Sequence, residues 1–369
     1  MENNQKQVAG KDSTQLQANV INIYNGITEE RAREISKETM QQVLNQCSVE
    51  SGKVAQQRIE DFQDKVLPRI ASIEKDFVSF SDPAFQVLYK KAQLSAACSG
   101  EDLDYGMLSE LIAHRIINKD DTKKKASIEK AVEIIDKIDE DALCGLTMVY
   151  TINQFSPLSG NISHGLSVIN NLYAKIQYMD LPNVETGWID NLDILSAVRI
   201  QSVTTFKKFE EYVSEMWDGY VSCGIKKDSS QYEWALKKME EVKLPVNFLI
   251  ENELLDGYVR VPVVNKNSIE QLRIAINVSI EGLNAPVFIP LEDKQKAVVK
   301  EIFEKKDTTS PLIQTMKENF KNKLLSYEAI KKSQVWWNKL TPYFQITSIG
   351  KAIAHANAKR IDQLLPDLD

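Results

Sequence analysis

The chain has 369 residues, of which 43% are hydrophobic and 26% charged, and its formal net charge is −7. These values are those of an ordinary globular protein with room for two or three domains. The polar N-terminus and the lack of any run of 18 apolar residues argue against a secretory signal and a membrane span.

The cysteines fit an intracellular protein. None of Cys47, Cys98, Cys144 and Cys223 belongs to a C-x-x-C pair, and each falls in or beside an expected helix. This pattern predicts reduced thiols that pack as small hydrophobic side chains, and hence a cytoplasmic protein.

Residues 1–26 form a polar segment that contains a strand-like run from Gln15 to Tyr24. Its apolar residues share one face and then switch to the other, which indicates a bulge or a strand that is apolar on both sides. Because no other strand-like run lies nearby, we expect this strand to pair with its copy in another subunit; a disordered tail is the alternative. The residues expected in this oligomerisation contact are Leu16, Ala18, Val20, Ile21, Ile23 and Tyr24.

Residues 27–80 are expected to form long helices, like a stalk or a coiled coil. Thr28 is a good N-cap, and the glutamates that follow it stand where the helix dipole favours acidic groups. Apolar residues then recur at helical spacing from Ile59 to Phe77, with Pro68 among them. The pattern predicts either two long helices or one bent helix.

Residues 81–196 are expected to form a helical bundle. Ser81-Asp82-Pro83 starts a helix, because proline is favoured in the first turn. Amphipathic segments with short links follow, and short links favour antiparallel neighbours. The expected helices span about 83–98, 102–118, 122–138, 140–155, 160–178 and 187–196.

Residues 197–369 mix helix and strand patterns, which predicts a small α+β C-terminal domain. Short strands are expected near 198–203, 258–264 and 344–346. The expected helices span about 205–223, 230–242, 245–257, 268–280, 292–305, 311–320, 327–339 and 347–359. The fold class is therefore mainly α, with helical bundle domains, an N-terminal β-strand oligomerisation element and this α+β region.

Two segments of the C-terminal region resemble pieces of a winged-helix domain. Leu249–Val261 has the pattern of a helix that ends in an L-L-x-G turn before a strand. Pro342–Ala354 has the pattern of a strand that leads into a helix through T-S-x-G. Both patterns are generic cap and strand chemistry, so they describe the region as winged-helix-like and no more.

Basic residues concentrate in 294–360, with 14 Lys or Arg against 5 Asp or Glu. Such a block attracts phosphates, but it can equally dock on the acidic body of the same chain or of a neighbour. Trp336-Trp337 lies among lysines. Such an arrangement can bind nucleic acid by stacking and phosphate contact, but packing of the two rings in the core or in an interface is the favoured interpretation. The candidate nucleic-acid contacts are Lys331, Lys332, Trp336, Trp337, Lys339, Lys351, Lys359 and Arg360.

The sequence contains no motif for catalysis, cofactor binding or metal binding. His114, His164 and His355 fall in separate expected helices without metal-ligand spacing, so each is expected to be structural. Glycine-rich phosphate loops and the G-x-S-x-G elbow are also missing. We therefore assign no catalytic residue, cofactor or metal; an enzyme with an unrecognised site stays open, because catalytic groups need only be close in space.

Four blocks of sequence occur in an order that resembles one family. They are A-G-x-x-S-x-Q-x-Q-A at Ala9–Ala18, N-G-I-T at Asn25–Thr28, S-D-P-A-F-Q at Ser81–Gln86 and T-S-x-G-x-A-I-x-H-A-N-x-K-R at Thr347–Arg360. The chain resembles an uncharacterised bacterial protein family known chiefly by locus tags. The resemblance implies no established activity and no catalytic residues. Similar polar N-terminal segments precede bacterial conflict proteins, including phage-defence components.

These patterns favour a non-enzymatic, homo-oligomeric sensor or scaffold of the bacterial cytoplasm. Its role would lie in antiviral defence or stress, with a protein partner or a phage trigger and without a membrane. A nucleic-acid-binding protein that uses the basic C-terminal region is the second hypothesis, and an enzyme with an unrecognised site is the third.

Overall fold

The protein is mainly α-helical, as expected, with a few short strands. The computed structural model describes residues 27–99, 102–183, 185, 187–280 and 283–368. The expected N-terminal strand, with its contact residues between Leu16 and Tyr24, lies outside the described residues. Within those residues, every helix is too short or too polar to cross a lipid bilayer.

The helices follow the sequence pattern closely up to residue 196. The α-helices are α1 (Glu29–Leu44), α2 (Val49–Ile73), α3 (Pro83–Cys98), α4 (Asp102–Ile117), α5 (Thr122–Ile134), α6 (Glu140–Gln154), α7 (Ile162–Ile176), α8 (Trp188–Ile194), α9 (Phe209–Met216), α10 (Ser230–Glu241), α11 (Asp293–Glu304), α12 (Ser310–Leu325), α13 (Glu328–Trp337) and α14 (Ser348–Ile361). Short 3-10 helices cover Val78–Ser81, Ile135–Lys137, Gln177–Met179, Val246–Phe248 and Lys266–Gln271.

The strands form three small antiparallel sheets. They are β1 (Val198–Gln201), β2 (Ile225–Lys226), β3 (Ile250–Glu251), β4 (Tyr258–Arg260), β5 (Arg273–Ile280), β6 (Leu283–Pro290) and β7 (Tyr343–Ile346). β1 pairs with β7, with Val198 opposite Ile346. β4 lies between β2 and β3, and β5 and β6 pair only with each other within the described residues.

Side-chain caps fix the helix starts that the sequence predicted. The Thr28 hydroxyl accepts from the N–H of Arg31, and the Asp82 carboxylate accepts from the N–H of Ala84 beside Pro83. α2 is one continuous helix that contains Pro68, so the chain does not break at this proline. The expected pair of long helices is therefore α1 and α2.

Two expected helices are wrong. In place of a helix over 245–257 the chain forms a 3-10 turn and β3, because the buried amide of Asn252 donates to the carbonyls of Ser222 and Cys223 at 3.0 Å each. In place of a helix over 268–280 it forms a 3-10 helix and β5. Apolar residues there fall on every second position from Ile274 to Ile280, which is the period of a strand.

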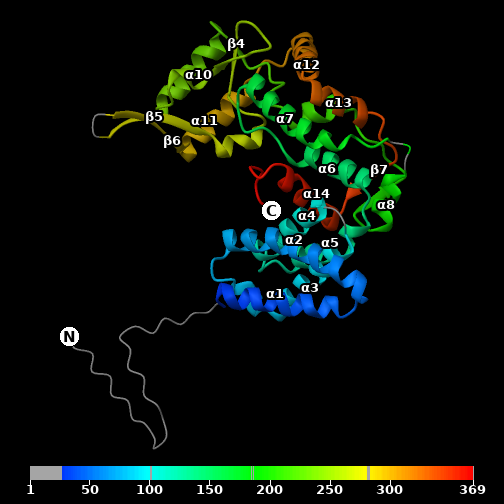
Figure 1. Cartoon of the computed structure of the whole chain (residues 1–369). Helices are drawn as coiled ribbons and strands as arrows, with labels where there is room; N and C mark the ends of the chain where they lie inside the picture. Colours follow the sequence, from blue (N-terminus) through cyan, green and yellow to red (C-terminus); the bar gives the residue numbers. More distant parts are fainter. Residues whose placement is uncertain (1–26, 100–101, 184, 186, 281–282, 369) are drawn as a thin grey trace, which may run out of the picture.

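The larger hydrophobic core runs from Ala32 to Ala358 and joins both ends of the described chain. α14 packs against α4, α5 and α6, and Figure 1 shows it between the lower helices α1–α5 and the upper part of the molecule. Because α14 is nearly all buried, it cannot act as a groove-reading recognition helix. The core therefore does not stop at the expected domain limit of residue 197.

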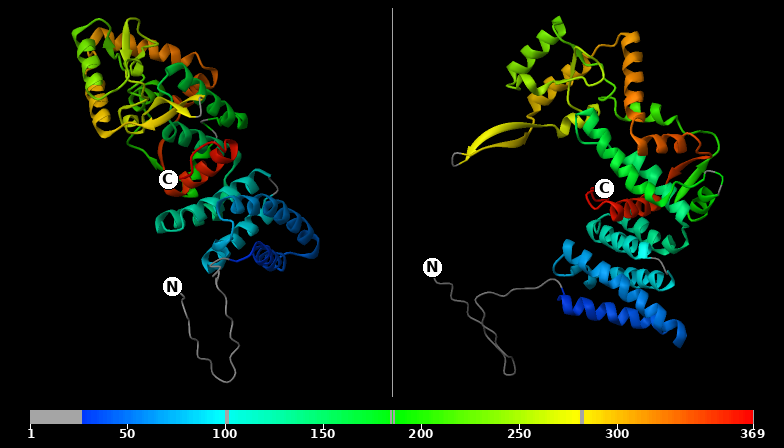
Figure 2. Two further views of the ribbon diagram at one scale, coloured as in Figure 1. Left: turned by 90° about the vertical axis from the view of Figure 1, so that its left-hand side faces the viewer. Right: turned by 45° about the horizontal axis from the view of Figure 1, so that its top comes forward.

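A smaller second core occupies residues 225–303, at the upper left of Figure 1. It is built mainly from α10, α11 and the strands β2 and β4, with buried Val259 and Ile302 among its members. The β5–β6 hairpin extends from this part of the molecule away from the helices, as both Figure 1 and the right-hand view of Figure 2 show. In chain order, the second core is inserted into the first.

A tight junction joins the two cores. Buried Arg260 donates to the carbonyl of Gly160 and to the carbonyls of Val261 (3.2 Å) and Val263 (3.3 Å). Burial lowers the pKa of Arg260 to about 10, so the guanidinium stays charged at neutral pH. A β-carbon at Gly160 would overlap the backbone of Pro262, so the two segments touch main chain to main chain.

Glu253 adds a second link across the junction, because it caps a helix of the first core. Its carboxylate accepts from the N–H groups of Ile162 (2.7 Å) and Ser163 (2.9 Å), at the N-terminus of α7. Negative charge is favoured there by the helix dipole. The inserted core is thus held to the first by both backbone contact and charge.

Candidate functional site

α13 separates two pockets, and the residues predicted to contact nucleic acid are divided between them. Lys331, Lys332, Trp336 and Lys339 line the first, a pocket of 640 Å³ that we call the α13 groove. Trp337 and Lys351 line the second, a pocket of 700 Å³ that we call the β7 pocket. Neither set includes Lys359 or Arg360.

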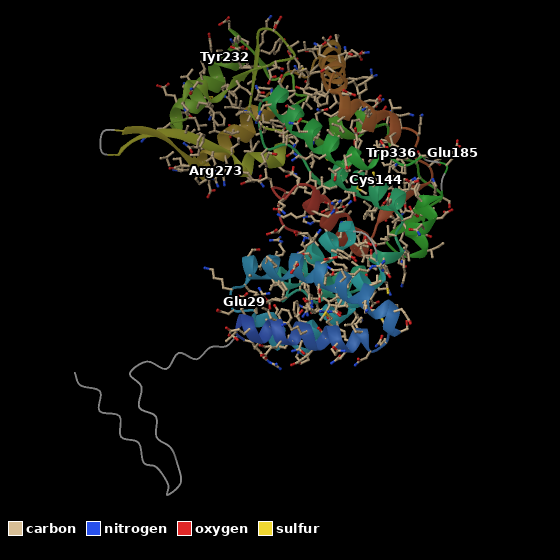
Figure 3. The ribbon with its side chains drawn as sticks, viewed as in Figure 1. Glu29, Cys144, Glu185, Tyr232, Arg273 and Trp336 are labelled. Carbon is tan, nitrogen blue, oxygen red and sulfur yellow. The ribbon has the colours of Figure 1, made fainter. Side chains whose placement is uncertain are left out.

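Both tryptophans of α13 are packing residues. Trp336 and Trp337 are 7% and 2% exposed, and their indole N–H groups donate to the carbonyls of Pro182 and Lys207 at 2.9 Å each. Trp336 stacks on Trp188, with ring centres 6.1 Å apart. Figure 3 labels Trp336 on the side of the molecule opposite Arg273, which begins β5. Little of either ring is open to a base, so the packing interpretation describes them best.

The α13 groove has mixed charge. Lys331, Lys332 and Lys339 are exposed, but Lys332 forms an ion pair of 3.1 Å with Glu328, and Asp180 lies in the same lining. The groove therefore offers lysines to a phosphate without forming a uniformly positive surface.

Lys359 and Arg360 are used inside the fold. The buried Lys359 ammonium donates to the carbonyl of Leu365 and pairs with Asp367 at 3.2 Å. Arg360 donates to the side-chain oxygen of Asn357 at 2.9 Å. Lys359 thus anchors the C-terminal turn and Arg360 bonds within α14, and neither lines a pocket with the other lysines.

Other parts of the basic region lie against acidic residues of the same chain. Lys296 and Lys300 both pair with Glu270, at 3.3 Å and 2.5 Å. Lys321 lies 3.9 Å from Glu210. Part of the charge asymmetry is thus used for intramolecular docking, which was one of the two interpretations of the sequence.

The β7 pocket is walled by aromatic side chains. Phe206 lies 4.8 Å from Tyr343 and 5.1 Å from Trp337, measured between ring centres. Tyr212 stacks on Trp337 at 5.4 Å. Burial raises the pKa of the Tyr212 hydroxyl, and the neighbouring Tyr343 adds to that effect.

Polar side chains from several elements complete this pocket. They come from the last turn of α6, from β1 and the loop after it, and from β7: Asn153, Gln154, Gln201, Thr204, Thr205 and Gln345. Sequence reasoning missed them, because isolated amides and hydroxyls at scattered positions carry no motif. Only the pairing of β1 with β7 brings Gln201 next to Tyr343.

A buried histidine pair joins α4 to α14. His114 Nε2 lies 3.1 Å from His355 Nδ1, and His355 Nε2 lies 3.0 Å from the carbonyl of Pro366. Because a carbonyl only accepts, His355 donates from Nε2 and His114 donates to its Nδ1. Burial, and then the neighbouring His355, hold the pKa of His114 well below its ordinary value. The structural role expected for these two residues fits this arrangement.

No group of three or more histidine, cysteine or acidic side chains that could hold a metal occurs in the described part of the chain. Of the cysteines, Cys144 and Cys223 are buried, Cys47 is half-buried and Cys98 exposed. Burial raises the pKa of the Cys144 thiol to about 12, so it is a poor nucleophile at neutral pH.

Fold and pockets together define a mainly helical protein with an inserted α+β core and two pockets on either side of α13. The chain belongs to an uncharacterised family named by a locus tag, whose model matches residues 26–368. The C-terminal block Thr347–Arg360 lies within the matched range, and Ala9–Ala18 lies outside it. No curated protein and no solved structure matches the chain.

Proposed function

We propose that the protein is a non-enzymatic, homo-oligomeric scaffold or sensor of bacterial antiphage defence, which acts in the cytoplasm and assembles by β-strand pairing. The defence role rests on the likeness of its polar N-terminal segment to those of conflict proteins. The assembly rests on one structural observation, the open edge of the β5–β6 hairpin.

The hairpin has two long strands and no third one. Its eight-residue strands pair only with each other within the described residues. Val287, Phe288 and Ile289 of β6 are 39%, 61% and 37% exposed. A long, apolar and unpaired strand edge is a template for another strand, and proteins that do not use such an edge usually protect it.

The direction of the backbone groups follows from one hydrogen bond at the base of the hairpin. The carbonyl of Leu272 accepts from the N–H of Leu291 at 3.2 Å. Successive residues of a strand alternate between facing the partner strand and facing away from it. The backbone N–H and C=O groups of even-numbered residues of β5 therefore point toward β6, and those of odd-numbered residues point outward.

β5 carries the usable edge. Its register places Pro286 and Pro290 of β6 opposite odd-numbered residues of β5, so both prolines face outward and that edge lacks two N–H groups. The outward N–H groups of β5 all exist, and they belong to Arg273, Ala275, Asn277 and Ser279. A new strand would add to β5.

The strand-like run Gln15–Tyr24 of a second copy is the occupant that fits this edge. Its alternating apolar residues need a pairing partner, and they match the apolar character of the hairpin. This assignment replaces the expected pairing between identical N-termini with pairing between an N-terminus and a hairpin.

Light scattering on size-separated protein tests the assembly. The full-length protein should be an oligomer of its 41.9 kDa chain, and deletion of residues 1–25 should give a monomer. Ala275→Pro removes one outward N–H of β5 and should also give a monomer, whereas Ala275→Ser keeps it and should not. If the deletion leaves the mass of the oligomer unchanged, the N-terminal segment does not drive assembly. If the deletion gives a monomer but Ala275→Pro leaves the oligomer intact, the segment binds at a site other than β5.

Nucleic-acid binding is the second candidate, because three exposed lysines line the α13 groove. Binding of labelled DNA and RNA should then weaken steeply with salt and fall when Lys331 and Lys339 are both changed to Gln. Phosphate contacts are strong at about 50 mM salt, so absence of binding at that concentration would exclude nucleic-acid binding.

A further inference from the structure

The β7 pocket has the size and construction of a small-molecule site. Its volume of 700 Å³ lies within the range of about 300–1000 Å³ that is typical of ligand pockets. It is assembled from α6, the β1–α9 connection, α9, α13, β7 and the first turn of α14.

The aromatic wall is suited to a flat ring. Phe206, Tyr212 and Tyr343 are half-buried, so each keeps part of its surface open to the pocket. Behind them, Trp337 and Phe344 hold Phe206 with ring centres 5.1 Å and 5.4 Å away. Heterocyclic rings bind such surfaces by stacking, in a manner that tolerates different bases.

The polar rim supplies donors and acceptors that the fold does not use. The side chains of Asn153, Gln154, Gln201 and Gln345 make no hydrogen bond to other described residues, and neither do those of Thr204 and Thr205. An amide offers both a donor and an acceptor, which is the pairing needed to recognise the edge of a nucleobase or the hydroxyls of a sugar.

The charge of the pocket favours one anionic group. The Lys207 ammonium pairs with Glu215 at 2.6 Å, so these two side chains cancel. Lys351 is exposed on the first turn of α14 and has no acidic partner within the described residues. One unpaired ammonium beside an aromatic wall matches a ligand that carries a single phosphate.

We infer that the β7 pocket binds a nucleoside monophosphate. The base stacks on Phe206 and Tyr343, the amides of the rim contact the base edge or the sugar, and Lys351 contacts the phosphate. This inference concerns a ligand site and does not depend on how copies of the chain assemble.

Titration calorimetry on the full-length protein tests the inference, with AMP, GMP, CMP and UMP as probes at fixed ionic strength. Each parent nucleoside and inorganic phosphate serve as separate probes for the two halves of the ligand. At least one monophosphate should bind with saturation and more tightly than its nucleoside. Lack of saturable binding by all four monophosphates would overturn the inference.

Two exposed lysines provide a matched pair of variants. Lys351→Gln should weaken binding of the monophosphate about tenfold and leave binding of the nucleoside unchanged, because only the charged contact with phosphate is lost. Lys332→Gln, in the α13 groove, should change neither. Equal losses in the two variants would contradict a phosphate contact in the β7 pocket.

Discussion

The two cores of this molecule are built in different ways. The first is helical, contains residues from near both ends of the described chain and is closed by α14. The second is smaller, mixes α10 and α11 with short strands, and continues into a hairpin with an open edge. The first core is thus closed by its own helices, whereas the second leaves a strand edge unpaired within the described residues.

The strength of the junction determines whether the two cores unfold together or separately. If the contacts around Gly160 and Arg260 dominate, both cores unfold together, because neither can move without breaking buried contacts.

Gly160→Ala should have the largest effect. The new β-carbon would lie 2.7 Å from the Cα of Pro262 and closer still to its carbonyl, and backbone on both sides cannot rotate away as a side chain could. We expect a loss of about 3 kcal/mol or more in the free energy of unfolding, measured by urea denaturation. The unfolding transition should also split into two.

Gly52→Ala is the matched control. Nothing lies within 4 Å of a β-carbon placed there in α2, so the same change should stabilise the protein by about 0.5–1 kcal/mol. Similar destabilisation by both variants would show that the junction has no special role.

Arg260→Met should cost about 2–3 kcal/mol, because it removes hydrogen bonds to the carbonyls of Gly160, Val261 and Val263 and leaves them buried. Denaturation monitored by circular dichroism measures the loss. Arg273→Met, at an exposed arginine of β5, should change the stability by less than about 0.5 kcal/mol. Equal effects would contradict the junction as the source of stability.

The histidine pair makes the first core sensitive to acid. Because the pKa of His114 is held below its ordinary value of 6.5, the residue takes up a proton on unfolding as the pH falls below 6.5. Its contribution is complete above pH 6.5 and is lost progressively as the pH falls toward the depressed pKa. Between pH 6.5 and 5.5 the wild type should lose about 1 kcal/mol more than His114→Leu.

His164→Leu is the control for that pH dependence, because His164 is exposed on α7. This variant should keep the wild-type slope of stability against pH. A wild-type slope in His114→Leu would show that the buried pair does not carry the effect.

Glu253→Gln should have the smallest effect, about 0.5–1 kcal/mol at pH 7, which is the usual range for a helix cap. Burial alone would raise the pKa of Glu253, but hydrogen bonds from the Ser163 side chain and from the N–H groups of Ser163 and Ile162 lower it. The contribution is present above the ordinary value of 4.5 and disappears as the pH falls through the depressed pKa. The difference in melting temperature between the wild type and Glu253→Gln should therefore disappear as the pH falls through that range.

Glu240→Gln, at an exposed position of α10, provides the comparison for Glu253. It should leave the melting temperature unchanged at both ends of the pH range. A gap for Glu253→Gln that stays constant down to pH 3, about one unit below the ordinary carboxylate value, would contradict the capping role.

The sequence predicted the first core well because its signals are local. Caps such as Thr28 and Asp82, with apolar residues at helical spacing, depend only on neighbours within one or two turns. In the second core, apolar residues from Ile274 to Ile280 fall at strand spacing, and the expected helix over 268–280 does not take that spacing into account. The extended backbone at Asn252 depends on carbonyls about 30 residues away, which no local pattern shows.

The candidate sites were predicted only in part, for a related reason. Clustering of lysines around Trp336-Trp337 pointed to α13, and three of these lysines line the α13 groove. It could not show that both indoles donate to backbone carbonyls of distant segments, or that the chain turns back to use Lys359 internally. The histidine pair joins residues 241 positions apart, so spacing in the sequence carried no signal for it.

The position of α14 has a consequence for folding during synthesis on the ribosome. The faces of α4, α5 and α6 that this helix covers are complete as sequence by residue 154, yet their cover ends at Ile361. During synthesis these apolar faces stay without α14 until some 200 further residues have been added, which takes about 10–40 s at ordinary elongation rates. The cover of these three helices is therefore added late, after the second core has been synthesised.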